Sequence, residues 1–574
     1  MKTTSLLSLS YLLLILLVVT SCGGETKNDN NNISTDEAVI AAGQATFDMT
    51  CGACHNFMQA GIGPQLGGLT KEVSADWIKN FVKNPQQMID SGDERAVMLF
   101  KKFNSYMPSF SYLSDEQIDQ VIAYINTKEA PVFGGGTDKG EALKNPIPDT
   151  IQTSDIVVAM KEITGLPASS DKQPINRMTK MDQLPGTKRS FVVDLNGRLY
   201  EMVNGQPKLY MDMAELMPNF IRQPGLATGF GSFAFHPEFS TNGLLYTTHT
   251  EPAGTKPADF AYADSIPVKL QWILTEWTTD PAAKAPFTST SHRELFRINM
   301  VTQIHGMQDI RFNPLVKKGD ADYGLLYVGL GDGGAAENGY AFLIDNLQTA
   351  WGSIFRIDPA GTNSKNGNYG IPASNPFVSD ANPNTVKEIY AKGFRNPHRL
   401  TWLQSGEMLA SNVGHHSIES LYMIQPGRNY GWPYREGTFV IDPYDDMYKV
   451  FANTIGPNDP ITYPVAQYDH DEGNAILGGF EYLGSDVLEL KGKYVFGDIV
   501  QGWLAYVNIA DLKLGQQATI KKWQVSMNGK PVNFKDICDC KKVDLRLGTD
   551  GDGELYIFTK TDGKAYKLVG SKAM

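Results

Sequence analysis

The stretch GLLYTTHT, Gly243–Thr250, places a turn-forming glycine ahead of residues that favour β-strands. The same Gly-x-Leu-Tyr pattern recurs, the last copy being looser, at Gly197, Gly324, Gly553 and Gly406. The early spacings approximate one and then two units of about 40 residues, which is the size of a propeller blade. Four-stranded blades around an axis bury both faces of each sheet. The recurring pattern therefore predicts that residues 150–574 form an all-β propeller of six blades.

Length and charge set the outer limits. A chain of 574 residues is too long for one hydrophobic core, so two or more domains are expected. Hydrophobic residues make up 42% and charged residues 20%, which is ordinary for a folded protein. The formal charge of -12 argues against nucleic acid or anionic lipid as a main partner.

The N-terminus has the pattern of an export signal. Lys2 precedes an apolar run at 6–19, which is shorter than the roughly 20 residues of a membrane span. The next residues, VTSC, resemble a bacterial lipobox and predict lipidation of Cys22; the alternative is a plain signal peptide with Cys22 incidental. We expect a signal at 1–21, a polar tether at 22–33, and a location in the bacterial cell envelope, periplasmic or associated with the outer membrane.

The stretch TCGACH, Thr50–His55, has the spacing that attaches a c-type haem. Cys51 and Cys54 lie on one side of a helical turn, so both thiols can reach the vinyl groups, and His55 can reach the iron. Behind an export signal the motif is specific, because this haem is attached outside the cytoplasm. A soft sixth ligand would suit an electron carrier. Met107, in the loop FNSYMPSF, is predicted for that role over the other methionines of the segment, Met58, Met88 and Met98, with a core methionine as the alternative.

Two capping boxes predict where helices begin, Ser34 to Glu37 and Ser114 to Gln117. A helical stripe of apolar residues follows the second box. From Ser34 to Lys128 the order of these features resembles class I cytochromes c, which implies a small all-α domain at 34–129. The resemblance also implies that the carbonyl of Pro64 accepts the ring N–H of His55. A stretch rich in glycine and proline predicts a linker at 130–149.

Downstream, eight motifs occur in a fixed order: GSFAFHPEFSTNGLLYTTHT, HGMQDIRFNP, LLYVGLGDGG, GSIFRIDPAG, EIYAKGFRNPHRL, NYGWPYREGTF, HDEGNAILGGFEYLG and LKGKYVFGDIVQGWL. Together they resemble the glucose/sorbosone dehydrogenase family, from about Leu184 to the C-terminus. The resemblance implies a six-bladed propeller that holds pyrroloquinoline quinone (PQQ) over its axis, with calcium beside it. A histidine then takes the hydroxyl proton of a sugar while hydride passes to the quinone.

Matching the family motifs residue by residue implies specific roles. His305 matches the catalytic base, and Arg395 with Asn396 matches the pair that contacts the quinone. The backbone carbonyls of Gly414 and His415 match ligands of the active-site calcium. Glu419 and the backbone carbonyl of Tyr430 match ligands of a second calcium. Lys541 and Lys542 are possible substitutes for the family's contacts to the carboxylates of PQQ.

Two positions differ from the glucose-oxidising members. Ile304 stands where they have an aspartate, and Ala227 stands where they have a glutamine. The resemblance therefore implies a sugar or a related alcohol or aldehyde as substrate, with glucose in doubt. Cys538 and Cys540 form a C-x-C pair that would make a strained ring if oxidised, so we expect a structural loop, with a metal or redox role as the alternative.

The fusion of the two domains favours a quinohaemoprotein dehydrogenase, which passes electrons from PQQ to the haem and on to a respiratory acceptor. Two alternatives stay open. The propeller could be a non-catalytic binding module with an electron-transfer cytochrome attached, or a calcium-dependent hydrolase of the lactonase type.

Overall fold

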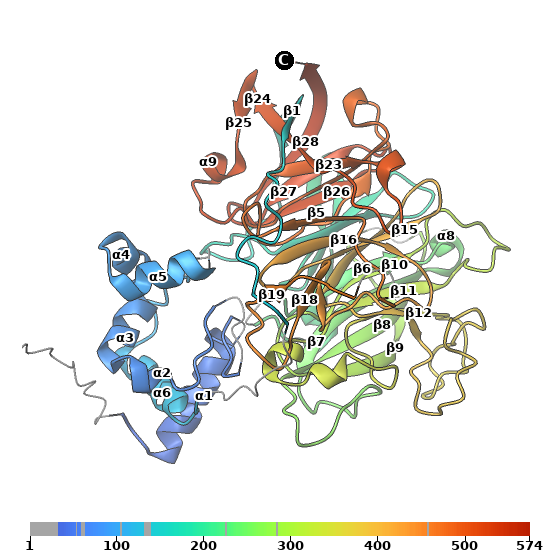
Figure 1. Cartoon of the computed structure of the whole chain (residues 1–574). Helices are drawn as coiled ribbons and strands as arrows, with labels where there is room; N and C mark the ends of the chain where they lie inside the picture. The colour runs from blue at the N-terminus through green and yellow to red at the C-terminus, as the bar shows by residue number, and fades with distance from the viewer. Residues whose placement is uncertain are drawn as a thin grey trace, which may run out of the picture.

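The computed structural model describes residues 33–52, 54–58, 63–103, 106–130, 139–223, 227–282, 285–455 and 459–573 (Figure 1). The predicted signal, Cys22 and the tether up to residue 32 lie outside this part of the chain, as do residues 131–138 of the predicted linker. In the ranges described, no helix is both long and apolar enough to cross a bilayer.

The first domain is helical and lies to one side of the molecule (blue in Figure 1). Its long helices α1 and α6 cross closely: an added Cβ on Gly43 of α1 would meet the carbonyl oxygen of Gln120 at 1.8 Å, so only glycine fits there. The helices are α1 (Glu37–Thr50), α2 (Leu69–Glu72), α3 (Ala75–Lys83), α4 (Pro85–Asp90), α5 (Glu94–Phe103) and α6 (Asp115–Asn126).

The sequence predicted one helix start correctly and the other wrongly. Helix α6 has the expected capping box, with Ser114 and Gln117 each bonding the backbone of the other. Helix α1 is capped by Asp36, whose carboxylate accepts the backbone N–H groups of residues 38 and 39. The Ser34 hydroxyl instead accepts from the backbone N–H of Asp36. Asp36 caps as well as serine does and lies directly before the helix, so it takes the position.

The second domain is an all-β propeller of six blades, as predicted (Figure 1). Blade I contains β2 (Met178–Gln183), β3 (Ser190–Asp194), β4 (Arg198–Val203) and β5 (Gln206–Asp212). Blade II contains β6 (Phe230–Phe235), β7 (Leu244–Pro252), β8 (Leu270–Thr279) and β9 (Ser289–Met300). Blade III contains β10 (Met307–Phe312), β11 (Leu326–Leu330), β12 (Ser353–Ile357) and β13 (Ile389–Lys392).

The remaining blades follow the same pattern. Blade IV contains β14 (Pro397–Trp402), β15 (Met408–Asn412), β16 (Ile418–Ile424) and β20 (Ala466–Asp469), with a small inserted sheet of β17 (Arg435–Glu436), β18 (Phe439–Ile441) and β19 (Val450–Phe451). Blade V contains β21 (Phe480–Glu481), β22 (Lys493–Gly497), β23 (Leu504–Asn508) and β24 (Lys521–Met527), with β25 (Lys530–Val532) beside β24. Blade VI contains β26 (Leu545–Thr549), β27 (Leu555–Thr559), β28 (Lys564–Ala573) and β1 (Thr153–Ile163).

The ring is closed by strands from both ends of the domain. Strand β1, the first after the linker, pairs antiparallel with β28, the last strand of the chain. It also pairs parallel with β24, which joins blades V and VI into one sheet. The outermost strand of the last blade therefore comes from the start of the domain.

The repeated glycines start equivalent strands in most blades. Gly243, Gly324, Gly406 and Gly553 each lead into the second strand of a blade, but Gly197 leads into the third strand of blade I. The prediction that the spacing from Gly197 to Gly243 equals one blade was therefore wrong. All five glycines have positive φ, and the signal they carry is the tight turn before a strand, which can precede more than one strand of a blade.

The first strands of neighbouring blades pack on one another around the axis. Because these inner strands run in one direction, the residues before them gather at one end of the ring, which we call the axial end. The second strand of each blade runs antiparallel to the first, so the residues after it return to the same end.

Candidate functional site

An apolar pocket in the helical domain contains the haem-attachment motif. Its walls include Cys51, Cys54, His55 and Met107. The two cysteines are not disulfide-bonded. Apolar side chains from α3, α5 and α6 line the remainder, as a haem macrocycle requires. Of the other methionines, Met58 and Met98 are 44% and 50% exposed, so Met107 is the best placed for the iron.

The proximal histidine is held in one orientation. His55 Nδ1 lies 2.8 Å from the carbonyl oxygen of Pro64, which accepts its N–H as the resemblance implied. This leaves Nε2 for the iron. Gly63 lies against the imidazole ring, since an added Cβ would meet Cε1 of His55 at 2.4 Å.

At the axial end of the propeller, the first hairpin of three blades brings together two polar positions. One residue precedes the first strand and the other follows the second strand. In blade III these are His305 and Asp332. The equivalent pairs are Arg395 with Gly414 in blade IV and Asp544 with Lys560 in blade VI.

His305, the predicted base, is buried and oriented by a carboxylate. Its Nδ1 lies 2.7 Å from Oδ1 of Asp332, whose Oδ2 accepts the indole N–H of Trp432 at 2.9 Å. The backbone of His305 has a φ of 55°, a conformation that residues other than glycine adopt rarely and that clusters at functional sites. Burial, and then the charge of Arg395, lower the pKa of His305, so its imidazole is neutral and can accept a proton.

Arg395 forms a buried charge pair beside this histidine. Its guanidinium donates to Glu337 in η1 (Ala336–Asn338) and to the carbonyl oxygen of Gly414. His415 Nδ1 lies 3.1 Å from the same Glu337 oxygen. Burial opposes ionisation of Glu337, but Arg395 and His415 outweigh it and hold the pKa of this carboxyl below its usual range. Within the described chain, Nε2 of His415 and Oδ1 of Asn396 are buried without a hydrogen-bond partner, so both can serve a ligand.

Two of the predicted calcium ligands, the Gly414 carbonyl and the Glu419 carboxylate, accept hydrogen bonds within the protein. The carbonyl of Gly414 accepts from Arg395, and both oxygens of Glu419 have partners: His470 Nε2 at 3.0 Å, and the backbone N–H groups of residues 414 and 476. Among the described residues, no three His, Cys, Asp or Glu side chains gather where they could hold a metal ion. The Gly414 carbonyl and the Glu419 carboxylate are therefore already engaged in hydrogen bonds, and the carbonyls of His415 and Tyr430 stay predicted calcium ligands.

A basic group that the sequence did not indicate lies across the axial end. Lys560 follows β27, with its Nζ 3.4 Å from Asp544, which also pairs with Arg546 at 3.0 Å. Burial lowers the pKa of Lys560 to about 7, and the charges of Arg546, Lys542 and Arg177 act in the same direction. Four cations around one aspartate favour an anionic ligand.

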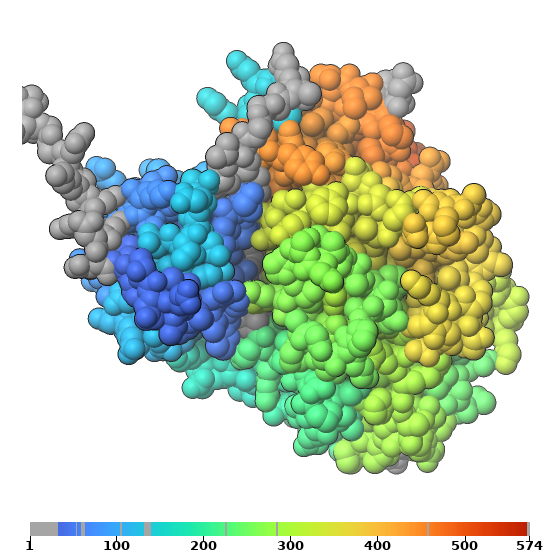
Figure 2. All heavy atoms as spheres, turned by 90° about the horizontal axis from the view of Figure 1, so that it is seen from below, coloured from blue at the N-terminus to red at the C-terminus, as the bar shows by residue number. Residues whose placement is uncertain are grey.

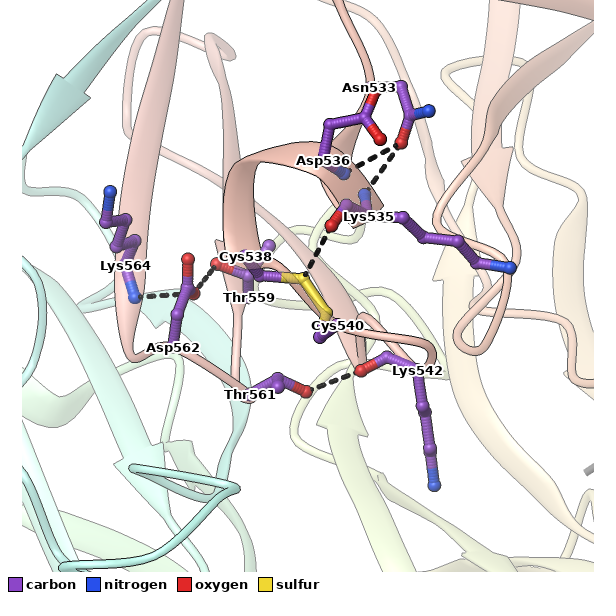
Figure 3. The surroundings of a disulfide bond; sticks show 10 residues. All are labelled: Asn533, Lys535, Asp536, Cys538, Cys540, Lys542, Thr559, Thr561, Asp562 and Lys564. Carbon is purple, nitrogen blue, oxygen red and sulfur yellow. Dashed lines mark hydrogen bonds between the residues drawn. A yellow bond between two sulfur atoms is a disulfide. The ribbon is translucent and has the colours of Figure 1, made fainter. Parts of the chain in front are cut away.

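Lys541 and Lys542 directly follow a disulfide between Cys538 and Cys540, at the end of α9 (Phe534–Cys538) (Figure 3). The expected structural loop at this pair contains a bridge, because the turn after α9 brings the two sulfurs together. The Lys542 carbonyl accepts from the hydroxyl of Thr561 at 2.7 Å.

The two lysines face the first domain. Lys541 donates to Gln86, and its Nζ lies 3.7 Å from the ring centroid of Tyr106, beside Met107. Burial raises the pKa of the Cys54 thiol, and the charge of Lys542 partly opposes this increase. Lys541 is thus a contact of the helical domain rather than of the propeller axis.

The helical domain lies over the axial end of the propeller, and the two domains are in contact when seen from below (Figure 2). Gln303, two residues before His305, donates to the backbone carbonyl of Asp48 in α1, and Lys269 pairs with the Asp48 carboxylate at 2.5 Å. On the other side of the haem pocket, Phe103 contacts the ring of His416, which follows His415. The haem pocket therefore faces the end of the propeller that contains His305.

A haem-binding helical domain and a propeller with a buried histidine–carboxylate pair define a cytochrome fused to an enzyme-like propeller. Family models agree: residues 40–129 match Cytochrome c, and residues 175–566 match Glucose / Sorbosone dehydrogenase. The chain belongs to the glucose/sorbosone dehydrogenase family and carries a cytochrome c domain in front of the propeller.

Similar proteins have different functions. Hedgehog-interacting protein of Mus musculus is 26% identical over 70% of this chain and 51% of its own length. Quinoprotein glucose dehydrogenase B of Acinetobacter calcoaceticus is 25% identical over 38% and 42%, respectively. The chain spans about half the length of the curated relatives it matches. The PQQ-bound aldose sugar dehydrogenase of Streptomyces coelicolor aligns over 72% of this chain and 98% of its own, with 18% identity and a TM-score of 0.47.

Sequence reasoning missed residues that act through the hairpins. Asp332 lies in GDGG, which draws attention only as a glycine-rich loop, and Lys560 lies in no motif. The position of these residues could have indicated them. In a blade, a polar residue one or two places after the second strand faces the residue before the first strand. Gln303 and Tyr448 contact the other domain and had no sequence signal.

Proposed function

We propose that the chain is a PQQ-dependent dehydrogenase that oxidises a sugar or a related alcohol or aldehyde and delivers the electrons to its own c-type haem. One observation carries the proposal: the buried His305–Asp332 pair lies beside Arg395 at the end of the propeller that faces the haem pocket. A binding surface has no need of a neutral buried histidine oriented by a carboxylate, and a hydrolase has no need of the haem.

The residues at the axial end fit an anionic quinone. PQQ supplies a centre that accepts hydride. Arg395 and Asn396 would hold its quinone edge, and Lys560, Arg546 and Lys542 would hold its carboxylates. Calcium is not part of the proposal, because Arg395 already occupies the carbonyl of Gly414.

His305 would remove the hydroxyl proton of the substrate at Nε2 while Asp332 fixes the Nδ1–H tautomer. Loss of that proton makes the adjacent C–H a good hydride donor. The positive charge of Arg395 stabilises negative charge that develops beside it. In total the alcohol loses two electrons and two protons as it becomes a carbonyl, so two single-electron transfers through the cytochrome to a respiratory acceptor balance each turnover.

We further propose that Cys22 is lipidated and tethers the protein in the bacterial cell envelope. The support is the sequence VTSC after an apolar run. Metabolic labelling with a fatty acid tests this: wild type should be labelled and Cys22→Ser should not. Label on the Cys22→Ser protein, or none on wild type, contradicts the proposal.

The decisive test of function is to add PQQ and a panel of sugars to the holocytochrome and to follow the haem spectrum. We expect haem reduction that is lost in His305→Ala. A binding module, which the similarity to Hedgehog-interacting protein makes the main rival, would show no haem reduction with any substrate. A lactonase would release product without an electron acceptor.

A further inference from the structure

Aromatic rings form a continuous set of contacts between the haem pocket and the axial end. Phe103 lines the haem pocket, and its ring centroid lies 5.2 Å from that of Tyr448. The ring of Tyr448 lies 3.8 Å from that of His416, which belongs to the axial loop after β15. Phe103 and His416 are themselves 5.7 Å apart, so the three rings form a triangle across the domain boundary.

On the propeller side, the triangle reaches both groups of the proposed site. Tyr448 lies 5.6 Å from the ring of His415, which bonds Glu337, the partner of Arg395. The ring of His415 is 6.2 Å from that of Trp432, whose indole N–H bonds Asp332. His305 and Arg395 are therefore each connected to Tyr448 by a short series of contacts.

On the cytochrome side, Tyr448 has a second contact. Its hydroxyl lies 3.5 Å from the carbonyl oxygen of Gly63, a long hydrogen bond. Gly63 is the residue packed against the His55 ring. Tyr448 thus touches the wall of the haem pocket through Phe103 and the proximal loop through Gly63.

We propose that Tyr448 is the positioning residue that holds the haem edge against the axial site, and that its ring, with those of Phe103 and His416, is the main electron path between the two. This rests on the proposed function. Along this path, electrons would pass one at a time from PQQ bound at the axial end to the haem. The external acceptor would reoxidise the haem between the two transfers.

The bridge carries no charge in its resting state. Burial, and then the neighbouring Glu337, raise the pKa of Tyr448, so its phenol stays protonated. Burial and the nearby His470 keep the pKa of His416 well below its usual value, so its imidazole stays neutral. The rings therefore provide contact without a titrating step.

The test compares Tyr448→Leu, which removes the ring, with Tyr448→Phe, which removes only the hydroxyl. The matched control is Tyr444→Leu in the same loop, where the side chain is 47% exposed. All variants are prepared as full-length holocytochrome. Three quantities are measured: the haem midpoint potential without PQQ, the rate of haem reduction by PQQ and sugar, and the rate of reduction of a small artificial dye by PQQ and sugar.

We expect Tyr448→Leu to reduce the dye at the wild-type rate but the haem roughly a hundredfold more slowly, the loss that a misplacement of about 1 Å causes. Tyr448→Phe should restore the haem rate. Both should shift the midpoint potential, because both lose the contact with Gly63, and Tyr444→Leu should change nothing.

An unchanged haem rate in Tyr448→Leu overturns the path while leaving the dehydrogenase intact. An unchanged midpoint potential in both Tyr448 variants overturns the positioning role. If wild type reduces neither dye nor haem with any substrate, the proposed function fails and the path fails with it.

Discussion

The side-chain amide of Gln303 donates a hydrogen bond to the backbone carbonyl of Asp48. Gln303 lies two residues before His305, and Asp48 lies three residues before Cys51, so one contact joins the segment of the proposed base to the helix that begins the haem-attachment motif. This hydrogen bond links the segment before His305 at the axial end to the segment before Cys51 at the haem pocket.

The thioether of Met107 is expected to set the properties of the haem. Met107→Ala removes a soft ligand, so the midpoint potential should fall and the iron should accept added imidazole or cyanide. Spectroelectrochemistry checks both effects. Met98→Ala, at a half-exposed position on α5, should behave as wild type. A normal potential in Met107→Ala would assign the sixth position to another group.

The pH profile of turnover should reflect the neutral state of His305. Burial and Arg395 lower its pKa from 6.5, so the active free base persists as the pH falls through 6.5, and kcat/KM declines only below the lowered pKa. His305→Ala should lose roughly 10²–10⁴-fold in rate, the usual contribution of a general base. His292→Ala, on the exposed part of β9, is the control. A decline that begins above pH 6.5 would contradict this assignment.

Binding of an anionic cofactor should take up a proton at Lys560. Its pKa is lowered to about 7, so at pH 8 most of it is neutral until a carboxylate arrives and raises its pKa. Calorimetry of PQQ binding in buffers of different ionisation enthalpy measures the uptake. Lys560→Met should abolish it and weaken binding by roughly ten- to a hundredfold, as expected for one charged hydrogen bond.

Lys513→Met, at an exposed position, provides the comparison for Lys560→Met. Equal proton uptake in the two variants would place the carboxylates of the cofactor away from blade VI.

A buried charge pair near the axis should contribute to stability in a pH-dependent way. Lys180 is 0% exposed, and its Nζ lies 2.9 Å from Asp309 Oδ1. Burial opposes ionisation of Asp309, but Lys180 and Arg399 outweigh it and lower its pKa to about 2. Asp309→Asn leaves the buried charges of Lys180 and Arg399 without their carboxylate partner, so it should lower the free energy of unfolding by about 3–5 kcal/mol.

Because the folded pKa of Asp309 is depressed, its contribution is present above the usual carboxyl value of 3.8 and is lost as the pH falls toward 2. Denaturant unfolding of wild type and Asp309→Asn between pH 3.8 and pH 2 should show their free energies of unfolding converging. Asp552→Asn, whose exposed carboxylate pairs with Lys188, should match wild type at neutral pH.

What the sequence could predict follows from how local each feature is. The C-x-x-C-H motif and the Ser114–Gln117 capping box are set within a few residues, so both were readable. The glycine before a strand was also readable. At Gly197, however, the turn precedes the third strand of blade I, so the spacing from Gly197 to Gly243 was wrongly taken as one blade unit. The sequence left the pairing of Cys538 with Cys540 open, because it depends on how the turn after α9 is formed.

The site itself depends on longer relationships. The contact of His305 with Asp332 needs the register of a hairpin, with Met307 opposite Leu330. The contact of Tyr448 with Phe103 needs the placement of one domain on another. A single sequence carries no local pattern for either, so these residues became visible only in three dimensions.

The closure of the ring by β1 and β28 has a consequence for biogenesis. Synthesis runs from the N-terminus to the C-terminus, so the haem-attachment motif emerges long before β28. Haem can therefore be attached to the helical domain while the propeller is still an open arc, and the axial end exists as a complete surface only after the final residues have emerged. Maturation of the cytochrome should precede its docking, so a chain truncated before β28 should contain haem but have no closed ring on which to seat it.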